Sequence, residues 1–198
     1  MPPILHSRQA FILASGSPRR RSFFQELGLL FRVVSADIEE KQIAGEAPVA
    51  YTRRLAFEKA RDVAEKYQDQ WIVGADTVVC YGEQILEKPA NSQDALRMLM
   101  CLRGREHIVH SSVNLQHIKK SVSELCSVAT RVRFWNFSEE IARSYVETGE
   151  PLDKAGGYGI QGKGAFLVRE VHGSYSNVVG LPLVECIEMF LRHGVVER

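Results

Sequence analysis

The chain has 198 residues, a length that suits one domain or two tightly joined lobes, and its composition of 45% hydrophobic and 25% charged residues is typical of a globular protein. The net charge of +1 argues against general binding of nucleic acids or anionic membranes, which requires a large basic excess. No apolar stretch approaches the roughly 20 residues of a membrane helix, and the N-terminus lacks the pattern of a secretory signal.

The first predicted strand and helix lie in and directly after the segment FILASGSPRRR, residues 11–21. Apolar residues at 12–14 predict a buried strand, which the Ser-Gly-Ser-Pro sequence ends, and residues 19–27 predict a helix. In a strand–turn–helix segment, the backbone N–H groups at the start of the helix point toward one place. The arginines at 19, 20 and 21 would add positive charge there, so this place could bind a polyphosphate. Taken alone, the segment fits an ordinary turn followed by a solvated basic face slightly better.

Strands and helices alternate irregularly over the rest of the chain. Further strands are expected at residues 31–35, 71–79, 84–86, 108–116, 125–134 and 165–171. Helices are expected at residues 48–66, 92–102 and 138–147 and from Pro182 onward. The strands at 108–116 and 125–134 predict a long hairpin joined by the polar stretch 117–124. This order favours a mixed α/β sheet, and no linker divides the chain.

The four cysteines are scattered and form no close pair of a metal-binding or redox type. They are Cys80, Cys101, Cys126 and Cys186. We therefore expect buried thiols in a reducing compartment, and a cytoplasmic protein.

Asp76 follows the apolar run WIVGA, so its carboxylate is expected at or near the end of a strand, beside Thr77. The rigid backbone of a strand can aim such a carboxylate into a crevice as a metal ligand or general base. A capping or turn role is the commoner one for an aspartate.

Asp153, Lys154 and Gln161 lie in a glycine-rich segment, residues 149–162. Glycines allow the backbone to approach a ligand, and the Gln161 amide can offer a donor and an acceptor to the edge of a base. A flexible surface loop would explain the glycines without explaining Gln161.

Several motifs follow one another in order along the chain. They are FILASGSPRRR at 11–21, ADTVV at 75–79, EKP at 87–89, GEPLDKAGGYGIQG at 149–162 and GSYSNVVGLPLVE at 173–185. With these motifs the chain resembles, over residues 11–191, the Maf family of nucleoside triphosphate pyrophosphatases, once named for septum formation. It departs from the family pattern at Arg103, where a serine is common, and at residues 110–112, which replace a Thr-containing stretch.

The resemblance implies a fold like that of the inosine triphosphate pyrophosphatases. This is an elongated mixed β-sheet with flanking helices, in two lobes around a central cleft, with residues 1–198 forming one domain without a linker. It also implies a homodimer that binds a nucleoside triphosphate, whereas the composition leads us to expect neither a nucleic acid nor a membrane as a partner.

The resemblance also assigns roles to individual residues. It makes Asp76 the catalytic base and, with Glu40, a ligand of the divalent cation, Mg²⁺ or Mn²⁺, that phosphate chemistry requires. Lys59 and Lys88 match lysines of the phosphate site. Composition alone would make Lys59 a solvated helix lysine and Glu40 an exposed loop glutamate. The expected substrate-binding residues are Ser15, Ser17, Arg19, Thr77, Asp153, Lys154 and Gln161.

Two branches of the family differ at three positions. The branch that acts on dTTP and UTP carries the residues found here, Arg19, Thr77 and Gln161, whereas the branch that acts on 7-methyl-GTP carries Trp, Gln and Glu. The resemblance therefore implies hydrolysis of dTTP and UTP, including modified pyrimidine nucleotides, to a monophosphate and pyrophosphate. The alternative is a non-catalytic nucleotide-binding regulator of cell division, which would not need Asp76, Glu40, Lys59 and Lys88 together.

Overall fold

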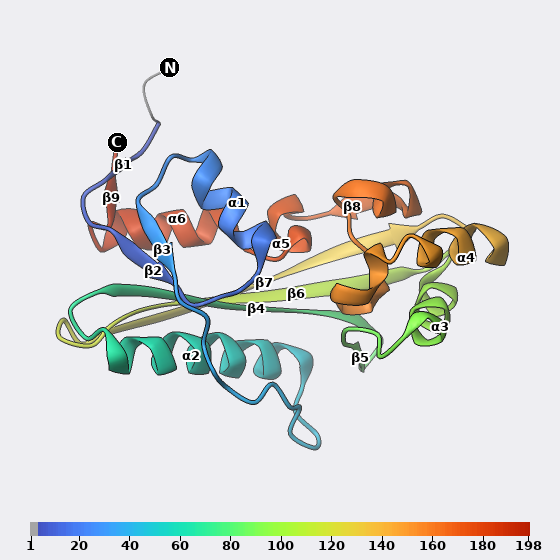
Figure 1. Ribbon diagram of the computed structural model, residues 1–198, viewed down its shortest axis with the longest axis horizontal. Coiled ribbons are helices and arrows are strands. Elements are labelled where there is room, and N and C mark those ends of the chain that lie inside the picture. The colour runs from blue at the N-terminus through green and yellow to red at the C-terminus, as the bar shows by residue number, and fades with distance from the viewer. Residues whose placement is uncertain (1–3) are drawn as a thin grey trace. The chain divides into compact units, whose positions relative to one another are not determined.

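The computed structural model describes residues 4–198 (Figure 1), which fold into two compact units. The first unit contains residues 4–76, Ser111–Ser127 and Gly180–Arg198. The second contains Thr77–His110 and Val128–Val179. The chain passes between the units three times inside strands and a fourth time between Val179 and Gly180.

In the described part of the chain, seven strands form one sheet in the order β3-β2-β4-β6-β7-β8, with β5 paired to β4. The strands are β2 (Phe11–Leu13), β3 (Phe31–Val33), β4 (Trp71–Tyr81), β5 (Gln84–Leu86), β6 (Glu106–His117), β7 (Val122–Phe134) and β8 (Val168–His172). β2 is parallel to β3 and β4, whereas β4–β5 and β7–β8 are antiparallel. The expected mixed α/β fold is confirmed.

Two short terminal strands, β1 (His6–Ser7) and β9 (Val196–Glu197), pair in a separate antiparallel ribbon. The sequence pattern did not predict them, because two residues are too few to show a period.

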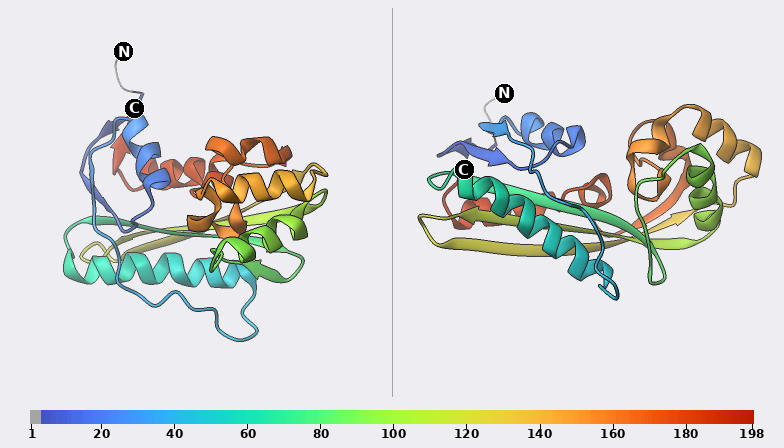
Figure 2. Two further views of the ribbon diagram at one scale, coloured as in Figure 1. Left: turned by 45° about the vertical axis from the view of Figure 1, so that its right-hand side comes forward. Right: turned by 60° about the horizontal axis from the view of Figure 1, so that its bottom comes forward.

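The first unit has helices on both faces of its strands, as Figure 1 and the left view of Figure 2 show. They are α1 (Pro18–Glu26), α2 (Pro48–Lys66) and α6 (Leu183–Arg192). Since side chains alternate along a strand, Phe11 and Leu13 join a core cluster with Phe190 of α6, whereas Ile12 packs with Val63 of α2. α2 thus covers the face opposite to α1 and α6.

The second unit packs its helices around a separate core. The helices are α3 (Ser92–Leu102), α4 (Glu139–Glu147) and α5 (Tyr175–Val179). Phe134, Tyr145 and Tyr158 are buried in this core with Leu99. His107 donates to or accepts from the Tyr158 hydroxyl at 2.8 Å, and burial lowers the pKa of His107 to about 3, so this imidazole is neutral.

Three expectations from the sequence need correction. The strand expected at 165–171 begins only at Val168, because Gly162–Leu167 forms a 3₁₀ helix that starts at a glycine with φ of 78°. Half of the polar stretch 117–124 is strand, since β6 and β7 leave only residues 118–121 between them. Cys80 and Cys186 are buried as expected, but Cys101 and Cys126 are only partly buried.

Among the described residues, no helix is long and apolar enough to cross a membrane.

Candidate active site

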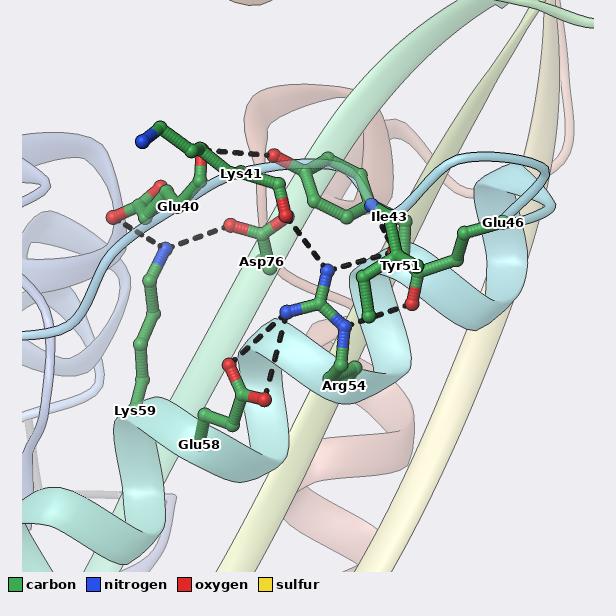
Figure 3. Close-up of polar contacts among 9 residues, drawn as sticks. All are labelled: Glu40, Lys41, Ile43, Glu46, Tyr51, Arg54, Glu58, Lys59 and Asp76. Atoms are coloured by element: carbon green, nitrogen blue, oxygen red, sulfur yellow. Dashed lines mark hydrogen bonds and ion pairs between the residues drawn. The ribbon is translucent and has the colours of Figure 1, made fainter.

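Three charged side chains meet in the first unit, from three different elements (Figure 3). Lys59 extends from α2, and Glu40 belongs to the loop between β3 and α2. Asp76 lies in the middle of β4, not at or near the end of a strand as the sequence predicted, because β-branched residues follow it and continue the strand to Tyr81. The Lys59 ammonium lies 2.7 Å from Asp76 Oδ1 and 2.9 Å from Glu40 Oε1. The predicted grouping of these three residues is therefore present in the structure.

The three residues differ in their contact with solvent. The side chains of Lys59 and Asp76 are each 9% exposed, whereas that of Glu40 is 51% exposed. Reading Lys59 as a solvated helix lysine is thus wrong, and Glu40 is an exposed loop residue that is ion-paired. Burying a charge without a partner costs several kcal/mol, so Lys59 and Asp76 depend on each other.

Burial also changes the acidity of Asp76. It raises the pKa of this carboxyl, while the positive charges of Lys59 and Arg20 act in the opposite direction. A carboxylate with a raised pKa accepts a proton more readily than an ordinary aspartate. Asp76 thus has the properties of a general base held by a cation.

The approach of α2 to Asp76 depends on Gly74. Ile72, Gly74 and Asp76 alternate along β4 and share the face that α2 covers. A Cβ atom at Gly74 would lie 2.3 Å from the Ala56 carbonyl oxygen and 2.5 Å from the Ala60 nitrogen, both backbone atoms of α2. Glycine is therefore required there for the helix that carries Lys59 to lie against the strand that carries Asp76.

We expect Gly74→Ala to displace α2 and to lower both stability and turnover. Overpacking of this kind costs about 1–3 kcal/mol, and here the neighbours are backbone atoms that cannot rotate away. Thermal unfolding and nucleotide hydrolysis measure the two effects. Gly28→Ala is the control, because its Cβ would meet open space at a φ of 67°; it should destabilise without lowering turnover. Wild-type melting and turnover in Gly74→Ala would contradict this account.

The turn before α1 uses both predicted serines in its own structure. Ser17 is the N-cap of α1, and Ser15 Oγ accepts from the Ser17 nitrogen at 3.2 Å. Arg20 is buried and donates to Ser15 Oγ at 3.1 Å and to the Gly180 carbonyl at 2.8 Å. The three neighbouring arginines therefore differ in burial, since Arg19 is partly buried, Arg20 is buried and Arg21 is exposed.

The remaining predicted residues belong to the second unit. Thr77 is partly buried directly after Asp76, and Lys88 is exposed between β5 and α3. Lys154 donates to Asp153 at 2.6 Å and to the Glu150 carbonyl at 2.7 Å. The exposed Gln161 immediately precedes the 3₁₀ helix Gly162–Leu167. The grouping of these five residues with the first-unit cluster stays a prediction.

Glu150 has a role that sequence reasoning missed. Its carboxylate accepts from the Lys163 and Gly164 nitrogens and from the Tyr145 hydroxyl, each at 3.0 Å. The Tyr145 hydroxyl in turn accepts from the Gly159 nitrogen at 3.1 Å. This network fixes the backbone on both sides of Gln161, so the glycine-rich segment is an ordered support rather than a flexible loop. The only sequence signal was an acidic residue at the start of that segment.

The carboxylates of Asp76 and Glu40 could bind a divalent cation whose other ligands are water and substrate phosphates. In residues 4–198, no group of three or more His, Cys, Asp and Glu side chains is arranged to hold a metal. Asp76 and Glu40 instead place two carboxylates around the same ammonium nitrogen. Mg²⁺ takes one or two carboxylates together with waters and phosphates, so this donor set fits it.

Comparison with known proteins identifies the family to which the chain belongs. The chain is 49% identical to a dTTP/UTP pyrophosphatase of Desulfotalea psychrophila, over 93% of this chain and 95% of that protein. It is 50% identical to a protein of the same name from Nitratidesulfovibrio vulgaris, over 93% of this chain and 88% of that protein. The Staphylococcus aureus Ham1 protein shares the fold, with a TM-score of 0.52 at 11% identity, over 94% of this chain and all of that chain. A family model described as Maf-like protein matches residues 10–193, and the chain therefore belongs to the Maf family.

Proposed function

We propose that this protein hydrolyses dTTP and UTP to the nucleoside monophosphate and pyrophosphate. The observation that carries the proposal is the buried Lys59–Asp76 pair, which joins a base-like carboxylate to a cation at 2.7 Å. The names of the similar proteins supply the substrates. The proposal includes a cytoplasmic homodimer that removes pyrimidine nucleotides, modified ones among them, from the nucleotide pool.

In the proposed reaction, Asp76 accepts a proton from a water molecule whose oxygen attacks the α-phosphorus. The bond between the α-phosphorus and the oxygen that bridges to the β-phosphorus breaks, and pyrophosphate leaves with the electron pair of that bond. Lys59 and Lys88 offset the negative charge of the phosphates, which charge-assisted hydrogen bonds do effectively. Asp76 and Glu40 would hold the divalent cation, Mg²⁺ or Mn²⁺, which when bound would supply further positive charge to the phosphate oxygens.

The proposed choice of base depends on Gln161, Thr77 and Arg19. Thymine and uracil present two carbonyl acceptors and one ring N–H along one edge. A glutamine amide can donate to a carbonyl and accept from the ring N–H. Thr77 leaves room beside Asp76, and Arg19 adds positive charge near the phosphates or the second carbonyl.

The proposal is tested by incubating the purified protein with dTTP, UTP, dCTP, GTP and 7-methyl-GTP in Mg²⁺ or Mn²⁺. We expect dTTP and UTP to be preferred, with monophosphate and pyrophosphate as products on chromatography, and no reaction in excess chelator. Release of a diphosphate and inorganic phosphate would contradict attack at the α-phosphorus. Nucleotide binding without hydrolysis of any triphosphate would favour the non-catalytic regulator instead.

A further inference from the structure

Glu40 belongs to a loop that has little structure of its own. The residues from Lys41 to Gly45 are exposed, and the backbone between β3 and α2 forms neither helix nor strand. Such a segment samples many conformations unless side-chain contacts hold it. Some contact must therefore fix the position from which the Glu40 carboxylate reaches Lys59.

Arg54 of α2 supplies contacts of that kind (Figure 3). Its Nε and Nη2 donate to the two carboxylate oxygens of Glu46 at 2.8 and 2.7 Å, and Nη2 also donates to the Lys41 carbonyl at 2.9 Å. Glu46 closes the loop on itself, because its carboxylate accepts from the Ile43 nitrogen at 3.2 Å. Arg54 thus binds the loop at Lys41, directly after Glu40, and again at its far end.

Tyr51, one turn earlier on α2, contacts the same loop. Its hydroxyl donates to the Glu40 carbonyl at 3.3 Å, and the Arg54 guanidinium lies over its ring, 5.5 Å from the centroid. The backbone of Glu40 and the carbonyl of the next residue are therefore both bound to α2, the helix that carries Lys59.

The contacts of Arg54 require a guanidinium and partial burial. The side chain of Arg54 is 23% exposed and that of Glu46 is 10% exposed. A planar fork can reach both oxygens of a carboxylate and a carbonyl at once, which a lysine ammonium cannot do in the same geometry. Surface ion pairs contribute little, but this pair combines low exposure with two-point geometry.

From these contacts we infer that Arg54 is a positioning residue that acts through Glu40. It anchors the 40–46 loop to α2 so that the Glu40 carboxylate meets the Lys59 ammonium above Asp76. The inference rests on the proposed function, which gives Glu40 a part in hydrolysis.

The test is a double-variant cycle on the turnover of dTTP, with Arg54→Gln, Glu40→Gln and the variant carrying both. Misplacement of an active-site group can cost up to about 100-fold, so we expect each single change to lower turnover by about tenfold or more. The double variant should be no slower than Glu40→Gln alone, since Arg54 acts through that residue. Glu46→Gln removes the carboxylate in the loop that Arg54 binds, so it should also lower turnover and add no further loss to Glu40→Gln.

The control is Arg61→Gln, a change of the same kind on α2. The side chain of Arg61 is 54% exposed and pairs along the helix with Glu65 at 2.6 Å; this variant should retain wild-type turnover. Independent effects that multiply in the double variant, or wild-type turnover in either Arg54→Gln or Glu40→Gln, would overturn the inference.

Limited trypsin digestion gives a measurement that does not depend on hydrolysis. We expect Arg54→Gln, but not Arg61→Gln, to be cleaved faster after Lys41, whose side chain is 79% exposed. If the wild-type protein hydrolyses no triphosphate, the proposed function fails and this measurement still decides whether Arg54 holds the loop. Equal cleavage of the Arg54 and Arg61 variants would overturn the inference.

Discussion

Purified Asp76→Asn protein is expected to hydrolyse dTTP at least about 100-fold more slowly than the wild type, the scale of losing a general base. Asparagine has the same shape but neither the negative charge nor the ability to take a proton. Lys59 keeps Glu40 as a partner at 2.9 Å, so the variant should fold. Steady-state kinetics measure turnover, and a direct nucleotide-binding measurement gives the affinity for dTTP. The affinity should change far less than turnover.

Asp69→Asn is the matched control for this substitution. The Asp69 side chain, in the turn between α2 and β4, is 61% exposed and pairs with Lys119 rather than with Lys59, so turnover should be unchanged. Because burial raises the pKa of Asp76, kcat/KM of the wild type should increase with pH through a value above the usual aspartate pKa of about 3.9. Turnover near the wild-type value in Asp76→Asn would remove this residue from the mechanism.

The combined change Arg19→Trp, Thr77→Gln and Gln161→Glu is expected to reverse the preference between dTTP and 7-methyl-GTP. A tryptophan can stack on the cationic methylated purine, and a glutamate can accept its donors and balance its charge. A site made for one hydrogen-bond pattern rejects another strongly, so we expect kcat/KM for dTTP to fall at least about 100-fold. Kinetics on both triphosphates measure the ratio.

The matching control for the acidic change is Gln25→Glu, on the exposed surface of α1. It adds the same charge and should leave the substrate ratio unchanged. An unmodified protein that prefers 7-methyl-GTP to both dTTP and UTP would show that the three positions do not set specificity in this chain.

Local signals in the sequence account for most of the fold. Glycine and proline mark the ends of α1 and the start of α2, and apolar periodicity defines α2 over the bounds that the structure has, Pro48–Lys66. The burial of Lys59 also had a signal, since it follows Leu55 by four residues and precedes Val63 by four, on the buried face of α2. Lysine is rarely buried unless it is paired, and its partner Asp76 is 17 residues away along the chain.

Contacts between distant residues could not be predicted in this way. Arg20 donates to the carbonyl of Gly180, 160 residues further along the chain, and no local pattern indicates this pair. The anchoring of the Glu40 loop by Arg54 likewise depends on the path of an irregular backbone. The resemblance to the Maf family assigned roles to Glu40, Lys59 and Asp76, but only the packing of α2 on β4 explains why Lys59 and Asp76 meet.

The alternation of side chains along β4 restricts how the length of this segment can vary. Trp71, Val73 and Ala75 belong to the cluster on one face, whereas Gly74 and Asp76 face α2. Deleting or inserting one residue between Trp71 and Asp76 would exchange the residues on the two faces of β4. The Asp76 carboxylate would then point toward the aromatic core on the opposite face from α2. Removing two residues would restore the face but shift Asp76 along the strand by about 7 Å, beyond the reach of Lys59. We therefore expect insertions and deletions to be tolerated in connections such as residues 118–121 and not inside this part of β4.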